Sequence, residues 1–199
     1  MRNTSKRYVR STETIPPKQR VVVITEGRST EPAYLSQLGK LLEGYIFTVV
    51  AQNGQSAPAH LVKKITAELK ESPLSKNDRA WIIYDADAWS QEHHLVVERW
   101  KNADARHSLG ISNPAFEYWL LLHFENGTGR STATEIQNAL TKHLPHHSKT
   151  NLGFTLTAAL LDTALAHAIT RAKHHPYPAA GSTTVHALIL QLTALQQES

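Results

Sequence analysis

The sequence contains no cysteine, and this absence removes several kinds of chemistry. A chain without thiols forms no disulfide, holds no zinc through thiolates and has no cysteine nucleophile. Long apolar runs are also missing, since no stretch reaches the length that a helix needs to cross a bilayer and no signal-like segment follows Met1. We therefore expect a cytoplasmic protein with no membrane partner.

Several common catalytic motifs are absent as well. Gly27 and Gly54 are isolated, and no Gly-x-x-x-x-Gly-Lys segment is present, so P-loop hydrolysis of ATP is excluded. The chain also lacks the Gly-x-Ser-x-Gly motif of serine hydrolases and every zinc signature. The net charge of +4 permits binding of nucleic acid without requiring it.

What the sequence does contain is two apolar segments that end in carboxylates. Residues 21–24 form a β-branched run that is typical of a strand buried on both faces, and Glu26 follows it. Residues 81–84 form a second such run, which is followed by Asp85 and Asp87. Ligands of open α/β sheets bind at the carboxyl ends of the strands, so these three carboxylates are candidate site residues. The alternative for Glu26 is that it only solvates a loop.

The Asp-x-Asp pair favours a metal ion. In an extended chain the side chains of Asp85 and Asp87 point to the same side, and their mutual repulsion is relieved by a cation. Ligands that are all oxygen suit a hard ion, with Mg²⁺ first and Mn²⁺ second. We predict that Glu26, Asp85 and Asp87 hold Mg²⁺.

The order of the expected elements indicates the fold class. Apolar strands alternate with amphipathic helices, which is the pattern of parallel βαβ units. We expect an α/β fold with a parallel sheet of about four strands flanked by helices. The strands are expected near residues 21–24, 45–51, 81–84 and 107–111.

The chain divides into three parts by composition. Residues 1–19 form a basic tail, either solvated or an arm that contacts phosphates. Residues 20–125 form the α/β core, and residues 126–199 form a helical extension packed on that core.

Two helix starts bear on the candidate site. Asn113 is predicted to cap a helix that has Pro114 at its first position, which places Glu117 one turn further on. Glu117 is then either a partner of the helix dipole or a further acidic group in the metal site. Thr183 or Thr184 is predicted to cap the last helix.

These motifs resemble known families. A Glu after the first strand and an Asp-x-Asp after a later one resemble the Toprim domain, the topoisomerase–primase module, which holds Mg²⁺ with such residues. The stretch Ser112-Asn-Pro-Ala-Phe-Glu-Tyr-Trp-Leu-Leu-Leu-His-Phe-Glu125 resembles the signature of RloB-like proteins, a Toprim-bearing family linked to bacterial phage defence. Residues 26–34 and 181–188 are similar to the same family.

The resemblance implies a Toprim-class, Mg²⁺-dependent nuclease that acts as a defence effector beside an ATPase of the AAA or ABC type. Strand passage or priming would need more room than 199 residues leave. A non-catalytic module that senses a nucleotide or nucleic acid with the same site is the alternative. RNA or DNA as substrate, the trigger and the oligomeric state, a homo-oligomer included, stay open. The candidate catalytic residues are Glu26, Asp85, Asp87 and Glu117, and the candidate substrate-binding residues are Arg28 and Lys149, the latter at a position where RloB-like proteins tend to carry a Lys.

Overall fold

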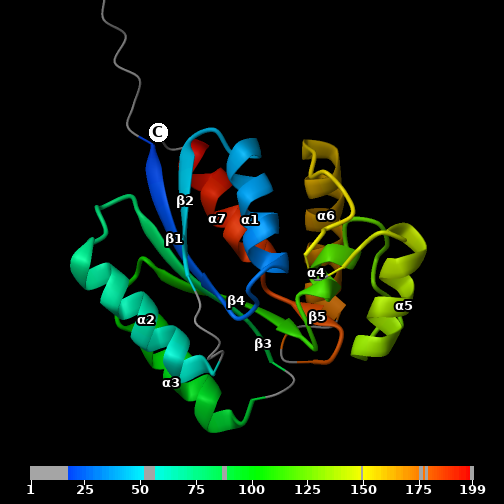
Figure 1. Ribbon diagram of the computed structural model, residues 1–199, viewed down its shortest axis with the longest axis horizontal. Helices are drawn as coiled ribbons and strands as arrows, with labels where there is room; N and C mark the ends of the chain where they lie inside the picture. Colours follow the sequence, from blue (N-terminus) through cyan, green and yellow to red (C-terminus); the bar gives the residue numbers. More distant parts are fainter. Residues whose placement is uncertain are drawn as a thin grey trace, which may run out of the picture.

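The computed structural model of the protein describes residues 18–51, 57–86, 89–148, 150–174, 177 and 179–197. In these residues a five-stranded sheet lies between helices on both of its faces (Figure 1). The strands are β1 (Gln19–Thr25), β2 (Tyr45–Val50), β3 (Arg79–Asp85), β4 (His107–Asn113) and β5 (Ser182–Thr183). The helices are α1 (Thr30–Leu41), α2 (Pro58–Glu71), α3 (Gln91–Asn102), α4 (Glu117–Leu121), α5 (Ala133–His143), α6 (Ala158–His174) and α7 (His186–Gln197).

The sheet has the strand order β2-β1-β3-β4-β5. Strands β1 to β4 pair in parallel, and β5 pairs antiparallel to β4. This arrangement confirms the predicted α/β class with a mostly parallel sheet flanked by helices, and it is consistent with a Toprim-like fold. The sequence did not indicate β5, because a strand of 2 residues carries no periodic pattern.

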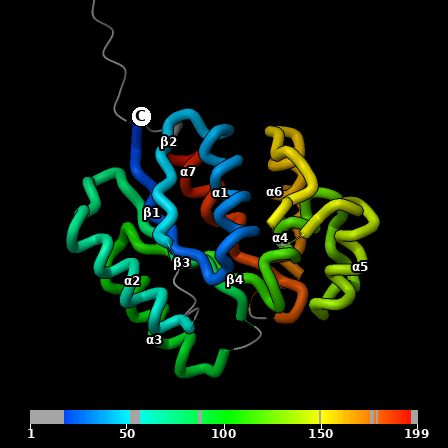
Figure 2. Tube along the Cα trace, viewed as in Figure 1, coloured from blue at the N-terminus to red at the C-terminus, as the bar shows by residue number. Residues whose placement is uncertain are grey.

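Strand β1 lies where the direction of the chain across the sheet reverses. Its alternate residues face opposite sides, so Val21 and Val23 join one hydrophobic cluster and Val22 and Ile24 join another. Helices α1 and α7 cover the first side, and α2 and α3 cover the second (Figure 2). The loops after β1 and β3 therefore leave the sheet toward opposite faces, which is the topological switch point of an open α/β sheet.

The C-terminal helices pack on the same side of the sheet as α1. Leu140 of α5, Ala164 of α6 and Leu188 of α7 belong to the same hydrophobic cluster as Val21 and Leu35. Residues before and after position 126 thus contribute to one continuous core. Helix α4 is fixed against the sheet because it also contributes fully buried side chains to this core.

The segment between β4 and α4 differs from the prediction. Asn113 was expected to cap a helix, but β4 extends to Asn113 because Ser112 pairs with Asp85 and Asn113 pairs with Ser182. The Asn113–Pro114 peptide is cis, and α4 begins only at Glu117.

The start of the last helix differs as well. Thr183 lies in β5, and its hydroxyl forms a hydrogen bond with the Ser112 hydroxyl at 2.9 Å. The Thr184 hydroxyl accepts a hydrogen bond from the Ile111 backbone N–H at 2.9 Å instead of capping α7. Both threonines therefore fasten the C-terminal segment to β4.

Candidate functional site

The carboxyl ends of β1 and β3 meet at the switch point of the sheet. Thr25 is paired with Ile83 in the last pair between β1 and β3, so Glu26 comes one residue and Asp85 two residues after that pair. The Glu26 backbone N–H donates to the Ile83 carbonyl at 2.9 Å, which extends the pairing by one step. The two predicted carboxylates that the structure describes here are therefore brought to the same edge of the sheet.

The Glu26 side chain connects the two loops at this edge. Its Oε2 accepts a hydrogen bond from the Asp85 backbone N–H at 2.9 Å and another from the Trp89 indole N–H at 3.3 Å. Trp89 lies just before α3, in the loop that leaves β3. The Glu26 carboxylate is thus held in a fixed orientation by donors from the neighbouring loop, as is common for carboxylates that bind metal ions.

Glu31 is a third acidic group at this edge, and it is not among the site residues predicted from the sequence. It lies in the first turn of α1, its residue is only 5% exposed, and its Oε1 accepts a hydrogen bond from the Gly27 backbone N–H at 2.9 Å. A single Glu in a first helical turn is ordinary because it complements the helix dipole. The one sequence signal for a functional role was that Glu31 follows Glu26 closely, with a turn at Gly27 between them.

The electrostatics of Glu31 place Glu117 in the same neighbourhood. Burial raises the pKa of the Glu31 carboxyl, and hydrogen bonds from the backbone N–H groups of Glu31 and Gly27 partly oppose this rise. The negative charges of Glu117 and Glu26 raise the pKa of Glu31 further. Glu26, Glu31 and Glu117 therefore lie within electrostatic reach of one another, and an added cation would relieve their repulsion.

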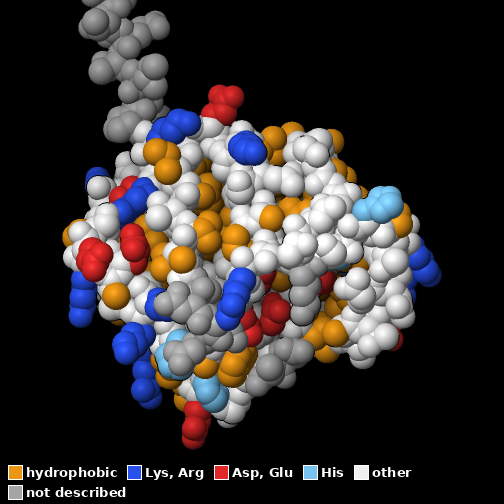
Figure 3. All heavy atoms as spheres, viewed as in Figure 1, with side chains coloured by type: hydrophobic (Ala, Val, Ile, Leu, Met, Phe, Trp, Pro, Cys, Tyr) orange, Lys and Arg blue, Asp and Glu red, His pale blue; other side chains and the backbone are white. Residues whose placement is uncertain are grey.

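Glu117 is half-buried at the start of α4. That helix has only 5 residues, so few aligned peptides contribute to a dipole there. Figure 3 shows acidic side chains gathered in a hollow near the middle of the face that it draws, where β1 ends and α1 begins in the same view of Figure 1. The short helix offers Glu117 little stabilisation through a dipole, and the charge of Glu117 acts on Glu31.

The remaining predicted residues lie elsewhere or outside the described part of the chain. Asp85 is half-buried at the end of β3. Arg28 is exposed in the loop between β1 and α1, two positions after Glu26. Asp87 and Lys149 lie outside the described residues.

The donor atoms at this edge suit a hard cation. All of the acidic side chains offer oxygen, and Glu26 is oriented by two N–H donors. Within the described part of the chain, which omits Asp87, no group of three or more His, Cys, Asp or Glu side chains is arranged to hold a metal ion. Oxygen atoms are the donors that Mg²⁺ and Mn²⁺ prefer, and Glu26 and Asp85 are the described residues of the predicted metal site.

A model of the RloB-like protein family matches residues 21–192 of this chain. The chain belongs to the RloB-like family. The match begins inside β1 and ends inside α7, so it includes Glu26, Glu31, Asp85 and Glu117. Comparison with curated proteins and with solved structures gave no match. In the described residues of this RloB-like protein, no helix is both long enough and apolar enough to cross a membrane.

Proposed function

We propose that this RloB-like protein is a Mg²⁺-dependent nuclease of the Toprim class, which hydrolyses phosphodiester bonds of RNA or DNA. One observation carries the proposal. The Glu26 carboxylate at the end of β1 accepts a hydrogen bond from the backbone N–H of Asp85 at the end of β3, 2.9 Å away. Two acidic residues from adjacent parallel strands are thereby fixed together at the switch point, where ligands of such sheets bind.

The side chains divide the chemical work in a simple way. Asp85, Asp87 and Glu26 would hold Mg²⁺, and the bound ion would stabilise negative charge on the phosphoryl group. Water attacks the phosphorus and gives up a proton to a base, the bond to the leaving oxygen breaks, and that oxygen takes up a proton. Glu26 lies at the strand end and can serve as a ligand or as the general acid and base at the bridging oxygen. The exposed Arg28 beside it offers a positive charge to a neighbouring phosphate.

The biological setting follows from the family resemblance. We propose that the protein is a cytoplasmic effector of bacterial anti-phage defence and that it acts beside an ATPase of the AAA or ABC type. The chain lacks a P-loop of its own, so energy from ATP would have to come from such a partner.

A non-catalytic binding module is the second candidate. The observation in its favour is that Oε2 of Glu26 already accepts two hydrogen bonds, from Asp85 and Trp89, which leaves less of this carboxylate for a metal ion. In this case the same edge would bind a nucleotide or nucleic acid and no bond would be cut.

A cleavage assay separates the two candidates. Pure protein is incubated with tRNA, plasmid DNA and single strands, in Mg²⁺, in Mn²⁺ or in EDTA. The nuclease proposal expects cleavage that EDTA stops, that Asp85→Asn abolishes and that Asp162→Asn, an exposed carboxylate on α6, leaves unchanged. Metal-dependent binding of these nucleic acids without cleavage would support the binding module instead.

A further inference from the structure

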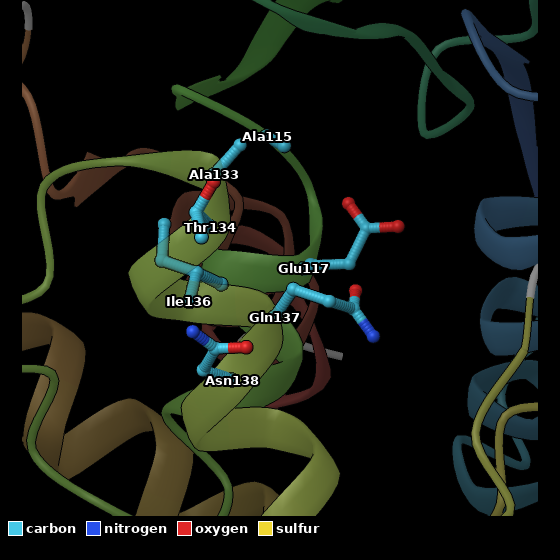
Figure 4. A pocket seen from close by; sticks show the side chains of 7 residues that line it. All are labelled: Ala115, Glu117, Ala133, Thr134, Ile136, Gln137 and Asn138. Atoms are coloured by element: carbon cyan, nitrogen blue, oxygen red, sulfur yellow. The ribbon is translucent and has the colours of Figure 1, made fainter.

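A pocket of about 400 Å³ lies between α4 and the first half of α5, and Glu117 is one of its lining residues (Figure 4). Its volume falls within the range of sites for small molecules, about 300–1,000 Å³. The lining residues are Ala115, Glu117, Ala133, Thr134, Ile136, Gln137 and Asn138.

The lining of this pocket suits an uncharged, flat group with hydrogen-bonding edges. Ala115 and Ala133 supply apolar surface, and Ile136, which also lines the pocket, is fully buried. Gln137 and Asn138 supply carboxamides, and each carboxamide both donates and accepts hydrogen bonds, as the edge of a nucleobase does. Among the described residues that line the pocket there is no Lys or Arg, so it is a poor site for a phosphate.

Gln137 is free to turn toward a ligand. Its side chain is exposed, and its Nε2 donates only a long hydrogen bond of 3.5 Å to the Thr141 hydroxyl. Figure 4 shows the carboxamide of Gln137 and the carboxylate of Glu117 projecting side by side toward the same open side of the pocket. A base edge that reached Gln137 would therefore also lie beside Glu117.

Glu117 links this pocket to the acidic edge, which is the edge at the ends of β1 and β3 where Glu26, Glu31 and Asp85 lie. Its charge acts on Glu31, and the charge of Glu26 acts on Glu31 as well. Glu117 therefore lines the pocket and also lies within electrostatic reach of Glu31. A nucleic acid offers a base and a phosphate that are separated by a single sugar, which suits a pocket that meets the acidic edge at Glu117.

We propose that the Gln137 pocket receives one nucleobase of the nucleic acid, next to the phosphate at the acidic edge. The carboxamide of Gln137 reads the base edge, and the apolar surface of Ala115 and Ala133 contacts its face. The placement of the phosphate rests on the proposed nuclease function. The contact with the base does not, and the two can be tested separately.

The first experiment uses uncharged nucleosides. Adenosine, guanosine, cytidine and uridine are titrated separately into the full-length protein in EDTA, and binding is followed by saturation-transfer NMR. We expect one nucleoside to bind in preference to the other three, Gln137→Ala to lose roughly tenfold in affinity, and Lys142→Ala, an exposed change on the same helix, to bind as wild type. Absence of binding by all four, or equal binding by Gln137→Ala, would overturn the proposal.

The second experiment uses cleavage of randomised single-stranded RNA and DNA pools in Mg²⁺. We expect a base preference next to the cut that Gln137→Ala flattens, with KM raised and kcat little changed. Cleavage without any such preference overturns the base pocket while the nuclease function stands. Binding of one nucleoside that depends on Gln137, in a protein that cuts neither pool, supports the pocket while the nuclease function fails.

Discussion

Glu31 is a buried carboxylate with like charges near it. The chain tolerates it because the Gly27 backbone N–H donates to its Oε1 and because the residue lies in the first turn of α1. Burial and the charges of Glu26 and Glu117 nevertheless raise its pKa above the usual value of 4.5. Folding therefore favours the neutral form of Glu31 relative to the unfolded chain, and charging it costs stability.

Glu31→Gln should for this reason raise the melting temperature in EDTA near pH 8. The sign follows from linkage: a carboxyl whose pKa is raised by folding contributes stability at low pH that is lost as the pH rises through the raised pKa. The gain should shrink near pH 4, where Glu31 is neutral. Glu135→Gln is the matched control with the opposite sign, because hydrogen bonds from Ser131 and Thr132 lower the pKa of Glu135. A lower melting temperature for Glu31→Gln near pH 8 would contradict this account.

His123 is a buried histidine, and only 1% of its surface is exposed. Its Nδ1 donates to the Trp119 and Leu120 carbonyls at 3.1 and 3.2 Å, and its Nε2 accepts from the Tyr34 hydroxyl at 3.2 Å. Burial lowers the pKa of His123 from 6.5 to about 4. The neutral ring is thus part of the core between α1 and α4.

Acid should weaken the fold through His123. Its contribution is complete above pH 6.5 and is lost as the pH falls from 6.5 toward 4, because the unfolded chain takes up the proton first. We expect the free energy of unfolding to fall by about 2 kcal/mol between pH 7.5 and pH 5 from this group. His123→Gln should be less stable overall but should lose this part of the slope in chemical denaturation, and His174→Gln, exposed on α6, should keep it. An unchanged slope in His123→Gln would contradict the assignment.

The turn between β1 and α1 is fitted closely around the Glu31 carboxylate. A Cβ at Gly27 would overlap the Glu31 carboxylate oxygens, so only a residue without a side chain leaves them in place. The same turn carries Glu26 into the site and Arg28 to the surface. The conformation of this turn therefore sets the positions of Glu26 and Glu31.

Gly27→Ala should displace the Glu31 side chain, shift the turn that carries the proposed ligand Glu26, and so abolish Mg²⁺-dependent cleavage while the protein stays folded. Gly129→Ala is the control, because its Cβ would meet nothing within 4 Å although its φ of +72° strains any other residue. We expect the control to cost about 1 kcal/mol of stability and to keep full activity. Equal activity of Gly27→Ala and wild type in the same assay would show that the fitted turn has no functional role.

The elements that the sequence predicted are those with a strong local pattern. The apolar runs of β1 and β3 and the carboxylates after them gave the sheet and its acidic edge, because parallel strands that are adjacent end at the same rim. The predicted start of α4 was wrong because Asn113 lies in β4. There it pairs with Ser182, which is a contact between distant parts of the chain. Glu31 was missed for a related reason: its burial depends on tertiary packing.

The C-terminal segment, which contains β5 and α7, completes the hydrophobic core. Val185, Leu188, Ile189 and Leu192 are fully buried in the cluster that includes β1 and α1. The Tyr45 hydroxyl at the start of β2 donates to the Leu192 carbonyl at 2.6 Å. Strand β5 therefore extends the sheet beside β4, and helix α7 covers, together with α1, one face of the sheet.

A chain that ends at Ala180 should fail to fold. The four buried side chains it loses are worth about 1.5–3 kcal/mol each, or roughly 6–12 kcal/mol together. Whole domains have a stability of about 5–15 kcal/mol, so little would remain. Circular dichroism and limited proteolysis of the truncated chain measure this directly. A cooperative melt close to that of the full chain would show that residues 181–199 are a separable extension.

If the carboxyl ends of β1 and β3 form one site for a divalent cation, electron paramagnetic resonance should detect Mn²⁺ bound there. We predict that the wild type binds Mn²⁺, that Mg²⁺ displaces it, and that Asp162→Asn binds as the wild type does. Asp85→Asn and Glu26→Gln should each weaken binding by roughly tenfold or more. The account would be contradicted by a folded wild type that binds no Mn²⁺, or by Asp85→Asn and Glu26→Gln variants that bind it as tightly as the wild type.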